Sequence, residues 1–267
     1  MYKTEKINEL TMKITDRYGE VIYLLLGTEH ALLIDSGMEK SNLLDVVSSI
    51  TSLPVILALT HGHIDHIGRS GDFDQVYMEL ADITTYLSHM QINVGHFNSN
   101  GLNFKEIKQI KSMPAFFDLG DRQIEVIPLP GHTPGSVIFV DKLQKMVFTG
   151  DAIGSGCGCW MQLDESLSIL EYQQYLHTVI EKLTVLGVDD NWQFFGGHDH
   201  QEYESQVSEF NRLDFQLLKD MEQLCIRLLH HEIVFHDTKA LKMTNQPYYV
   251  SYGKAEMIIT KEKTESC

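Results

Sequence analysis

An apolar run that stops at a group of histidines and an aspartate is the feature that most restricts the fold of this chain. Val55–Leu59 are five consecutive apolar residues, a pattern typical of a strand buried on both faces. The residues that follow are Thr60-His61-Gly62-His63-Ile64-Asp65-His66. Side chains two residues apart on extended backbone share a face, so His61 and His63 can bind one metal ion together. A helix beginning just after them would turn Asp65 and His66 toward a second position.

Three more candidate ligands stand where other apolar strands end. They lie in the blocks Gly131-His132-Thr133-Pro134-Gly135-Ser136, Thr149-Gly150-Asp151 and Gly196-Gly197-His198. Each block alone is a weak signal, since Thr-Gly-Asp is also a common turn. Glycine beside each ligand lets the backbone approach a shared centre closely. A surface cluster of polar residues is the alternative for the first motif, but three histidines and an aspartate in six positions argue against it.

Strands and helices alternate along most of the chain, which predicts sheets covered by helices in layers. Strands are expected at 21–26, 31–34, 55–59, 75–78, 123–129, 137–140, 146–148 and 193–195. Helices are expected at 41–50 behind a Ser41 cap, and at 81–90, 166–186 and 202–229. No linker or internal repeat stands out, so we predict a single domain over residues 1–267. Residues 202–267 would be its C-terminal extension, a helix followed by a tail of little periodicity.

Charge and cysteine content exclude several classes of protein. The 267 residues carry 21 Lys and Arg against 37 Asp and Glu, a net charge of −16. Nucleic-acid and anionic-membrane binding both need clustered basic residues, so neither is expected. Four cysteines in a chain of this length do not make a disulfide framework. Residues 1–10 lack the apolar run of a signal peptide, and no stretch is long enough for a membrane span. We therefore expect a cytoplasmic protein.

The ordered blocks resemble the metallo-β-lactamase superfamily, over roughly residues 20 to 200. The matching blocks are Asp35-Ser36-Gly37, His61-x-His63-x-Asp65-His66, Gly131-His132, Thr149-Gly150-Asp151 and Gly197-His198. The resemblance implies an α/β fold, a four-layer αββα sandwich with the metal site at one edge of the two sheets. It implies that the first metal is held by His61, His63 and His132. It implies that the second is held by Asp65, His66 and His198, with Asp151 bridging both.

Details of the blocks discriminate among branches of that superfamily. True zinc β-lactamases usually have a cysteine at the place of Asp151 and commonly lack the histidine equivalent to His66, so antibiotic hydrolysis is not expected. The flavodiiron branch has a glutamate at the place of His63. Nucleic-acid-processing branches usually add motifs that are absent from this sequence. The pattern is most similar to the glyoxalase II and lactonase-like hydrolases. A basic pair for glutathione is not evident, with only Lys239, Lys242 and Lys254 as candidates in the tail.

The resemblance implies a hydrolase in which hydroxide bound to two Zn²⁺ ions cleaves an ester, thioester or lactone of a small molecule. Nitrogen and carboxylate ligands suit Zn²⁺, and the same set also accepts Fe or Mn. The alternative is a phosphodiesterase for a small, choline-type or nucleotide-type phosphodiester. Such an enzyme should show Lys or Arg near the metals, and only Arg69 and Arg122 come near the motifs. A metal-binding sensor without hydrolysis is a third possibility.

Some residues have expected roles beyond metal binding. Asp65 is expected to orient the attacking water, and His200 to donate a proton to the leaving group. Cys157 and Cys159 follow Asp151 and lie near the predicted pocket, where they either line a tight loop or bind metal. Residues 89–103 are interpreted as a loop that overhangs the site and shapes substrate choice. The chain is compatible with a homodimer.

Overall fold

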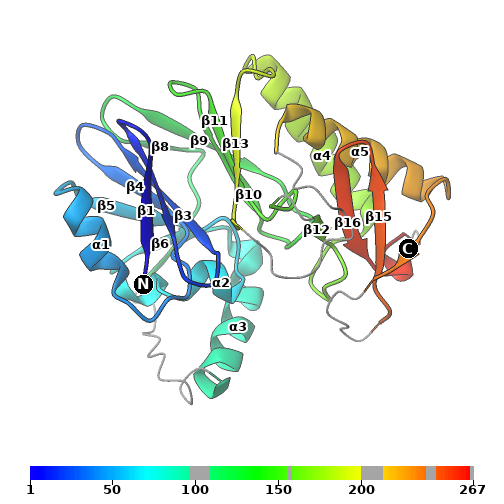
Figure 1. Ribbon diagram of the computed structural model, residues 1–267, viewed down its shortest axis with the longest axis horizontal. Coiled ribbons are helices and arrows are strands. Elements are labelled where there is room, and N and C mark those ends of the chain that lie inside the picture. The colour runs from blue at the N-terminus through cyan, green and yellow to red at the C-terminus, as the bar shows by residue number, and fades with distance from the viewer. Residues whose placement is uncertain (97–108, 156–157, 200–212, 239–244, 265–267) are drawn as a thin grey trace. The chain divides into compact units, whose positions relative to one another are not determined.

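The computed structural model describes residues 1–96, 109–155, 158–199, 213–238 and 245–264. The chain divides into two compact units, Met1–Val126 and Ile127–Cys267, which we call the first and the second unit (Figure 1). Each unit has a buried hydrophobic cluster of its own. The described part is a mixed α/β structure with several sheets. The single-domain organisation stays a prediction.

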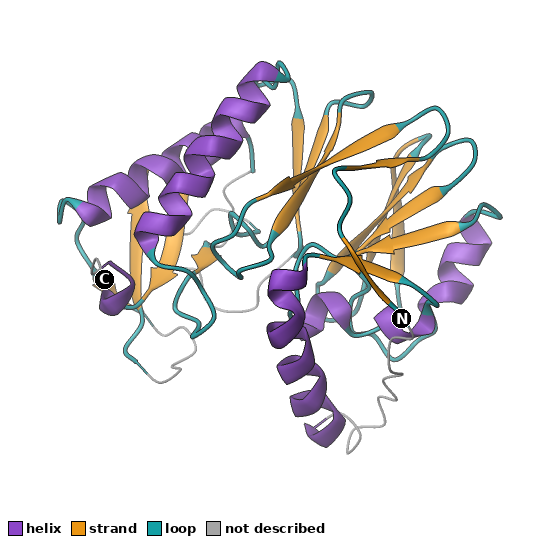
Figure 2. Cartoon of the chain, turned by 180° about the vertical axis from the view of Figure 1, so that it is seen from behind, coloured by secondary structure: helices purple, strands orange, loops and turns teal. Residues whose placement is uncertain are grey.

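A seven-stranded sheet in simple chain order forms the body of the first unit (Figures 1 and 2). Its strands are β1 (Lys3–Asn8), β2 (Thr11–Thr15), β3 (Val21–Leu26), β4 (Ala31–Ile34), β5 (Val55–Ala58), β6 (Val76–Met78) and β7 (Ile110–Ser112). Strands β1 to β4 pair antiparallel, and β4 to β7 pair parallel. The predicted strands at 21–26 and 31–34 are confirmed with their bounds. The apolar run at 55–59 is a strand as predicted, although its first two residues, Val55 and Ile56, are only half-buried.

Helices of the first unit follow the strands that carry the site. They are α1 (Leu43–Ile50), α2 (Ile64–Ile67) and α3 (Ile83–His96), with short 3-10 turns η1 (Ser70–Asp72) and η2 (Leu80–Asp82). The cap of α1 is Asn42, whose side chain accepts a hydrogen bond from the Leu44 N–H, so the expected Ser41 cap is wrong by one residue. Helix α2 begins where the first motif predicts. Helix α3 runs six residues past the predicted end at residue 90, so residues 89–96 of the expected 89–103 loop are helical.

The hairpin β8 (Phe116–Asp118) and β9 (Gln123–Pro128) leads into the second unit, whose sheet has the order β13-β11-β10-β9. The strands β10 (Val137–Asp141), β11 (Met146–Gly150) and β13 (Gln193–Gly196) stand where the sequence predicts them. Helix α4 (Ile169–Val185) starts three residues later than expected, because Ser168 and Glu171 form a capping box at its first turn. Helix α5 (Phe215–Leu229) takes up the later part of the predicted 202–229 helix. Residues 200–212 lie outside the described residues.

The tail forms a sheet that the sequence pattern did not predict. Strands β14 (His236–Asp237), β15 (Tyr248–Tyr252) and β16 (Ala255–Ile259) join β12 (Cys159–Trp160) in the order β12-β16-β15-β14, and η4 (Lys261–Thr264) follows. All five residues of β16 are buried, including the charged Glu256, so its sequence shows neither an uninterrupted apolar run nor a regular polar alternation. Helices α4 and α5 lie side by side in both views, and α5 also contacts β15 and β16 (Figures 1 and 2). None of the helices in the described ranges is long and apolar enough to cross a membrane.

The buried carboxyl of Glu256 in this tail sheet predicts a pH-dependent stability. Burial raises the pKa of Glu256 from its ordinary 4.5 to about 7. The folded chain therefore binds this proton more tightly than the unfolded chain does, and the stability gained is complete below pH ~4.5 and lost as pH rises through about 7. At pH 8 we expect the Glu256→Gln variant to unfold a few degrees above the wild type. This corresponds to a gain in unfolding free energy of roughly 1 kcal/mol after solvent screening. Thermal unfolding from pH 5 to 8 measures this, with exposed Glu9→Gln as the control. An unchanged pH profile would contradict it.

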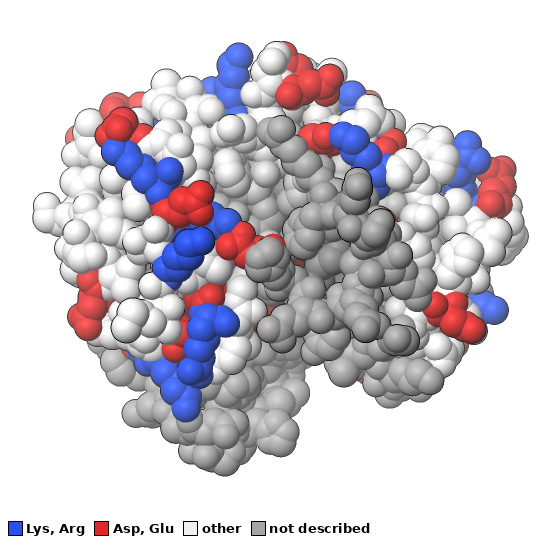
Figure 3. Space-filling view, viewed as in Figure 1, with Lys and Arg blue, Asp and Glu red and all other residues white. Residues whose placement is uncertain are grey.

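Surface charge is mixed on the face shown in Figure 3. Lys and Arg side chains alternate there with Asp and Glu among the described residues, and no continuous basic surface forms on that face.

Candidate metal centre

Parallel pairing of β4 and β5 brings two sequence blocks of the first unit to one edge of the sheet. Ile34 is opposite Ala58 in the register, and the Asp35 N–H donates to the Ala58 carbonyl at 2.9 Å. The carboxyl ends of parallel strands meet at the same edge, so Asp35 lies beside the chain leaving β5. Asp35 adopts φ +64°, a left-handed conformation that aspartate tolerates better than most residues.

His61 and His63 converge on one point, as their spacing predicts. His61 Nε2 and His63 Nδ1 lie 3.1 Å apart, and the two rings are nearly perpendicular at 82°. Two nitrogens bound at about 2.0–2.1 Å to one tetrahedral Zn²⁺ stand about 3.3 Å apart. Both side chains are buried, with 2% and 6% of the residues exposed. The pair therefore fits a shared metal ion without rearrangement.

A hydrogen-bond network around Asp35 sets which nitrogen of two histidines is available. The Thr60 hydroxyl donates to Asp35 Oδ2 at 2.8 Å, so its oxygen can only accept from His61 Nδ1, which lies at 3.0 Å. His66 Nδ1 lies 2.8 Å from the same carboxylate oxygen and donates to it. Both rings therefore carry their proton on Nδ1 and present the Nε2 lone pair. This is the arrangement that metal-binding histidines use.

Helix α2 carries the other two candidate ligands of the first unit. Asp65 Oδ2 lies 3.8 Å from His66 Nε2, and the Asp65 side chain is 27% exposed. Ser36 holds this helix from the β4 edge, because its N–H and its hydroxyl both donate to the His66 carbonyl, at 2.8 and 2.9 Å. The block Asp35-Ser36 thus restrains the His66 side chain and its backbone at once.

Register in the second unit brings its three candidate ligands to one sheet edge as well. Strands β11 and β13 are parallel, with Gly150 opposite Gly196, so Asp151 and His198 follow neighbouring strand ends. Strand β10 is antiparallel to β11, and the residues before it, including His132, lie at the same edge. The start of β10 lies beside the end of β11 because the two strands are antiparallel, so His132 comes to the edge that also carries Asp151 and His198.

Asp151 lies between the two histidines of the second unit. Its Oδ2 is 3.1 Å from His198 Nε2 and 3.9 Å from His132 Nε2. Its other oxygen accepts from the Ser155 hydroxyl at 3.2 Å, and the Ser155 oxygen accepts from the Gly197 N–H at 2.9 Å. Ser155 therefore links the Asp151 carboxylate to the loop that carries His198. One carboxylate oxygen flanked by two imidazole nitrogens is suited to bridge two cations.

The His132 ring is oriented by the Trp160 carbonyl, a backbone group that leaves no side-chain signal in the sequence. Its Nδ1 lies 2.7 Å from the Trp160 carbonyl oxygen, which can only accept, so Nε2 carries the lone pair. The Ser166 hydroxyl donates to the His132 carbonyl at 2.8 Å. Gly131 packs against the buried Tyr172 ring, where an added Cβ would lie 2.1 Å from a ring carbon. This close approach is why the position before His132 is glycine.

Cys159 is buried, and its thiol lies beside the backbone of Asp151 and Ala152. Its Sγ lies 3.6 Å from the Asp151 carbonyl and 3.7 Å from the Ala152 carbonyl, within reach as a weak donor. Burial raises the pKa of the Cys159 thiol to about 12. Cys157 lies outside the described residues.

The seven ligands expected from the resemblance form a set of four in the first unit and a set of three in the second. Each carries a nitrogen or a carboxylate oxygen of the kind that holds a metal ion. His200 and residues 97–103 of the expected overhanging loop lie outside the described residues. Sequence reasoning missed the contributions of Thr60, Ser155 and Trp160. Thr60 and Ser155 stand beside the motifs, which is the signal that could have found them.

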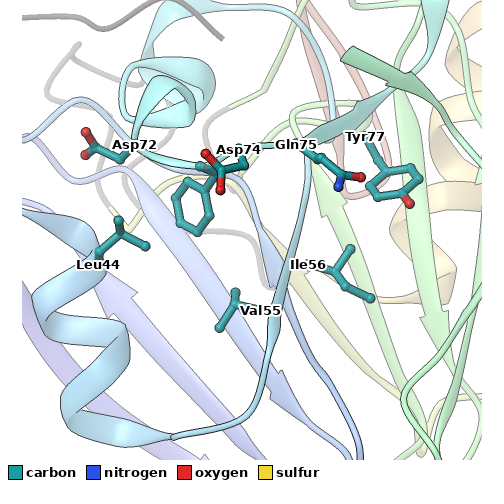
Figure 4. Close-up of a pocket in the computed structure, with 8 residues that line it drawn as sticks. Leu44, Val55, Ile56, Asp72, Asp74, Gln75 and Tyr77 are labelled. Carbon is teal, nitrogen blue, oxygen red and sulfur yellow. The ribbon is translucent and has the colours of Figure 1, made fainter. Parts of the chain in front are cut away.

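A separate cavity of about 450 Å³ lies in the first unit, away from these ligands (Figure 4). Its lining combines an apolar floor with polar residues: Leu44, Val55, Ile56, Asp72, Phe73, Asp74, Gln75 and Tyr77. This cavity explains why Val55 and Ile56 are only half-buried at the start of β5.

Comparison with known sequences identifies relatives of this chain. Residues 15–213 match the metallo-beta-lactamase superfamily. Human acyl-coenzyme A thioesterase MBLAC2 is 28% identical over 165 residues, 51% of this chain and 58% of the relative. Hydroxyacylglutathione hydrolase GloC of Haemophilus influenzae is 25% identical over 134 residues, 48% of this chain and 63% of the relative. The matches thus span less than two thirds of the length of these relatives.

Solved structures share the fold. DIM-1 metallo-beta-lactamase exposed to ceftazidime superposes with a TM-score of 0.58 at 16% identity, covering 84% of this chain and 96% of that one. TTHA1623 in a di-iron-bound form gives 0.57 at 21% identity, covering 77% and 95%. These likenesses confirm the expected metallo-β-lactamase fold. With the sequence match over residues 15–213, they show that the chain belongs to the metallo-β-lactamase superfamily.

Proposed function

We propose that this protein is a cytoplasmic, metal-dependent hydrolase that cleaves an ester, thioester or lactone bond of a small molecule. The observation that carries the proposal is that hydrogen bonds already fix the tautomer of three histidine ligands. Three buried histidines each have their Nδ1 proton engaged by an oxygen, which leaves Nε2 open to a metal. A histidine that served only for packing would not need this arrangement at three separate positions.

The ligands of both units would together hold two ions. His61, His63 and His132 would bind the first ion, and Asp65, His66 and His198 the second, with Asp151 shared. Two such ions supply a water-derived nucleophile at neutral pH and polarise the bond that is cleaved. We propose Zn²⁺ because nitrogen and carboxylate donors suit it, although a related fold is known in a di-iron form.

Side chains of the site would orient the reactants. Asp65 is exposed enough to reach solvent, so its carboxylate would accept a hydrogen bond from the attacking water and direct it at the substrate carbonyl. His200 would donate a proton to the leaving group. A structural Zn²⁺ site is closed by four protein ligands. Seven ligand groups shared between two ions do not close both sites, which leaves room for water and substrate.

A thioester is the bond we favour among the three. The relatives include an acyl-coenzyme A thioesterase and a hydroxyacylglutathione hydrolase, which supports this class. The two arginines that could recognise a phosphodiester are engaged elsewhere. Arg69 pairs with Asp72 at 2.5 Å, and buried Arg122 donates to the carbonyls of Leu10 and Leu26. Their engagement weakens the phosphodiesterase alternative.

Metal removal and a substrate panel test the proposal. Protein stripped with a chelator should lose turnover and regain it with two equivalents of Zn²⁺. Restored protein should hydrolyse a glutathione or coenzyme A thioester, or a homoserine lactone, faster than an aryl phosphodiester. A preference for the phosphodiester would replace this proposal with the alternative. Binding of two ions with no turnover on any of these substrates would support a metal sensor.

A further inference from the structure

The 3-10 turn η2 and the first residues of helix α3 lie directly against the loop that carries His61 and His63. Asp82 Oδ2 accepts a hydrogen bond from the Gly62 N–H at 2.8 Å. A Cβ added at Gly62 would lie 3.0 Å from the Tyr86 nitrogen and 3.1 Å from the Asp82 carbonyl oxygen. Residues Asp82 and Tyr86 of these two segments therefore pack closely against the ligand loop.

His89 of the same helix makes two distinct contacts with the ligand segment. Its Nδ1 lies 3.3 Å from the Ile64 nitrogen and accepts the N–H of the first residue of α2. Its ring stacks on the His63 ring, with centroids 4.7 Å apart and an interplanar angle of 19°. A nitrogen that accepts from a backbone N–H carries no proton, so His89 in this contact is the neutral tautomer protonated on Nε2.

The first contact replaces a missing helix cap. His63 stands at the N-cap of α2 and makes no side-chain capping hydrogen bond. Helix α2 has only four residues, too few to be stable without outside support. By accepting the Ile64 N–H, His89 holds the end of the helix that carries Asp65 and His66.

The second contact restrains the ring of a ligand. His63 Nδ1 must face His61 Nε2 for the two nitrogens to meet one ion, and rotation of the His63 ring would break that alignment. A ring stacked on its face limits this rotation. The two contacts of His89 thus act on different ligand pairs, one through a stacked ring and the other through a hydrogen bond.

We propose that His89 is a positioning residue that aligns the ligands of both metal ions, His63 by stacking and the Asp65–His66 pair by capping α2. This inference rests on the proposed function only in assuming that the ligands bind metal. It assigns a role to a residue outside the superfamily blocks, on a helix that follows the first motif.

Two variants separate the contacts. His89→Phe keeps an aromatic ring over His63 and removes the acceptor. His89→Asn removes the ring and keeps an acceptor, because its Oδ1 occupies a place close to that of Nδ1. His177→Asn removes a helical histidine from the exposed surface of α4 and is the matched control. The readouts are Co²⁺ titration of the metal-free protein, followed by the absorption spectrum of each bound ion, and thermal unfolding without metal.

We expect His89→Phe to lower the affinity for the ion bound by Asp65 and His66. We expect His89→Asn to lower the affinity for the ion bound by His61 and His63, each by about 10–100-fold. The control should bind both ions as the wild type does. Because the titration needs no substrate, its result is independent of whether the protein hydrolyses thioesters. Wild-type affinities in both variants would overturn the proposal. Equal weakening of both ions with a matching loss of unfolding temperature in the metal-free protein would also overturn it, since that result indicates a purely structural role.

Discussion

Replacing Asp65 with alanine is expected to reduce the turnover number of the Zn²⁺-loaded protein by about 10²–10⁴-fold, the range typical for a lost proton-transfer or orienting group. The change removes both a ligand and the carboxylate that directs the attacking water. The fold should survive, because 27% of the Asp65 side chain is exposed and α2 is held by Ser36 and His89. Steady-state kinetics on the preferred substrate, with metal content measured on the same sample, provide the test.

Asp45→Ala is the matched control for this prediction. Asp45 is an exposed aspartate in the first turn of α1, on the same unit and away from the ligands. It should keep wild-type turnover. If Asp65→Ala retains two ions and loses less than about 10-fold in turnover, the role assigned to Asp65 is wrong.

Replacing Asp35 with asparagine should lower both metal affinity and stability. Asp35 is buried, with 2% exposed, and each of its oxygens accepts at least one hydrogen bond. An amide in place of the carboxylate must direct an NH₂ group at a donor, either the Thr60 N–H or the Thr60 hydroxyl and His66 Nδ1. Asparagine tolerates the positive φ of this position, so backbone strain does not confuse the result.

We expect the unfolding free energy of Asp35→Asn to fall by ~3 kcal/mol, as for loss of hydrogen bonds to a buried charge. The dissociation constants of both ions should rise about 10–100-fold, since His61 and His66 lose the acceptor that sets their tautomers. Urea unfolding of the metal-free protein and metal titration measure the two effects.

Asp16→Asn separates stability from ligand positioning. Asp16 is also buried, and its carboxylate accepts hydrogen bonds from the backbone N–H groups of Tyr18, Glu20 and Met38. The Asp16→Asn variant should unfold more easily than the wild type and bind both metal ions with wild-type affinity. Equal metal affinities in the Asp35 and Asp16 variants would show that Asp35 does not set the ligand tautomers.

Local sequence patterns were sufficient for the strands that carry the site. The apolar runs at 21–26, 31–34 and 55–59 became β3, β4 and β5, because a buried strand has a strong and short-range signature. The helix after His63 also began where the motif required. The tail strands β15 and β16 carry no comparable signature, because Glu256 interrupts the apolar residues of β16 and the β15 sequence mixes apolar and polar residues.

Long-range contacts decided the rest. The sequence by itself determined which residues offer ligand atoms and that each stands at the end of a strand, since residue type and hydrophobic period are local properties. Only the tertiary structure decided which nitrogen each histidine presents, because that depends on acceptors far along the chain. Asp35 serves His66 across 31 positions, and the Trp160 carbonyl serves His132 across 28. A backbone carbonyl is common to every residue and a stacking partner such as His89 stands outside any motif, so neither can be read from the sequence without the fold that brings them to the ligands.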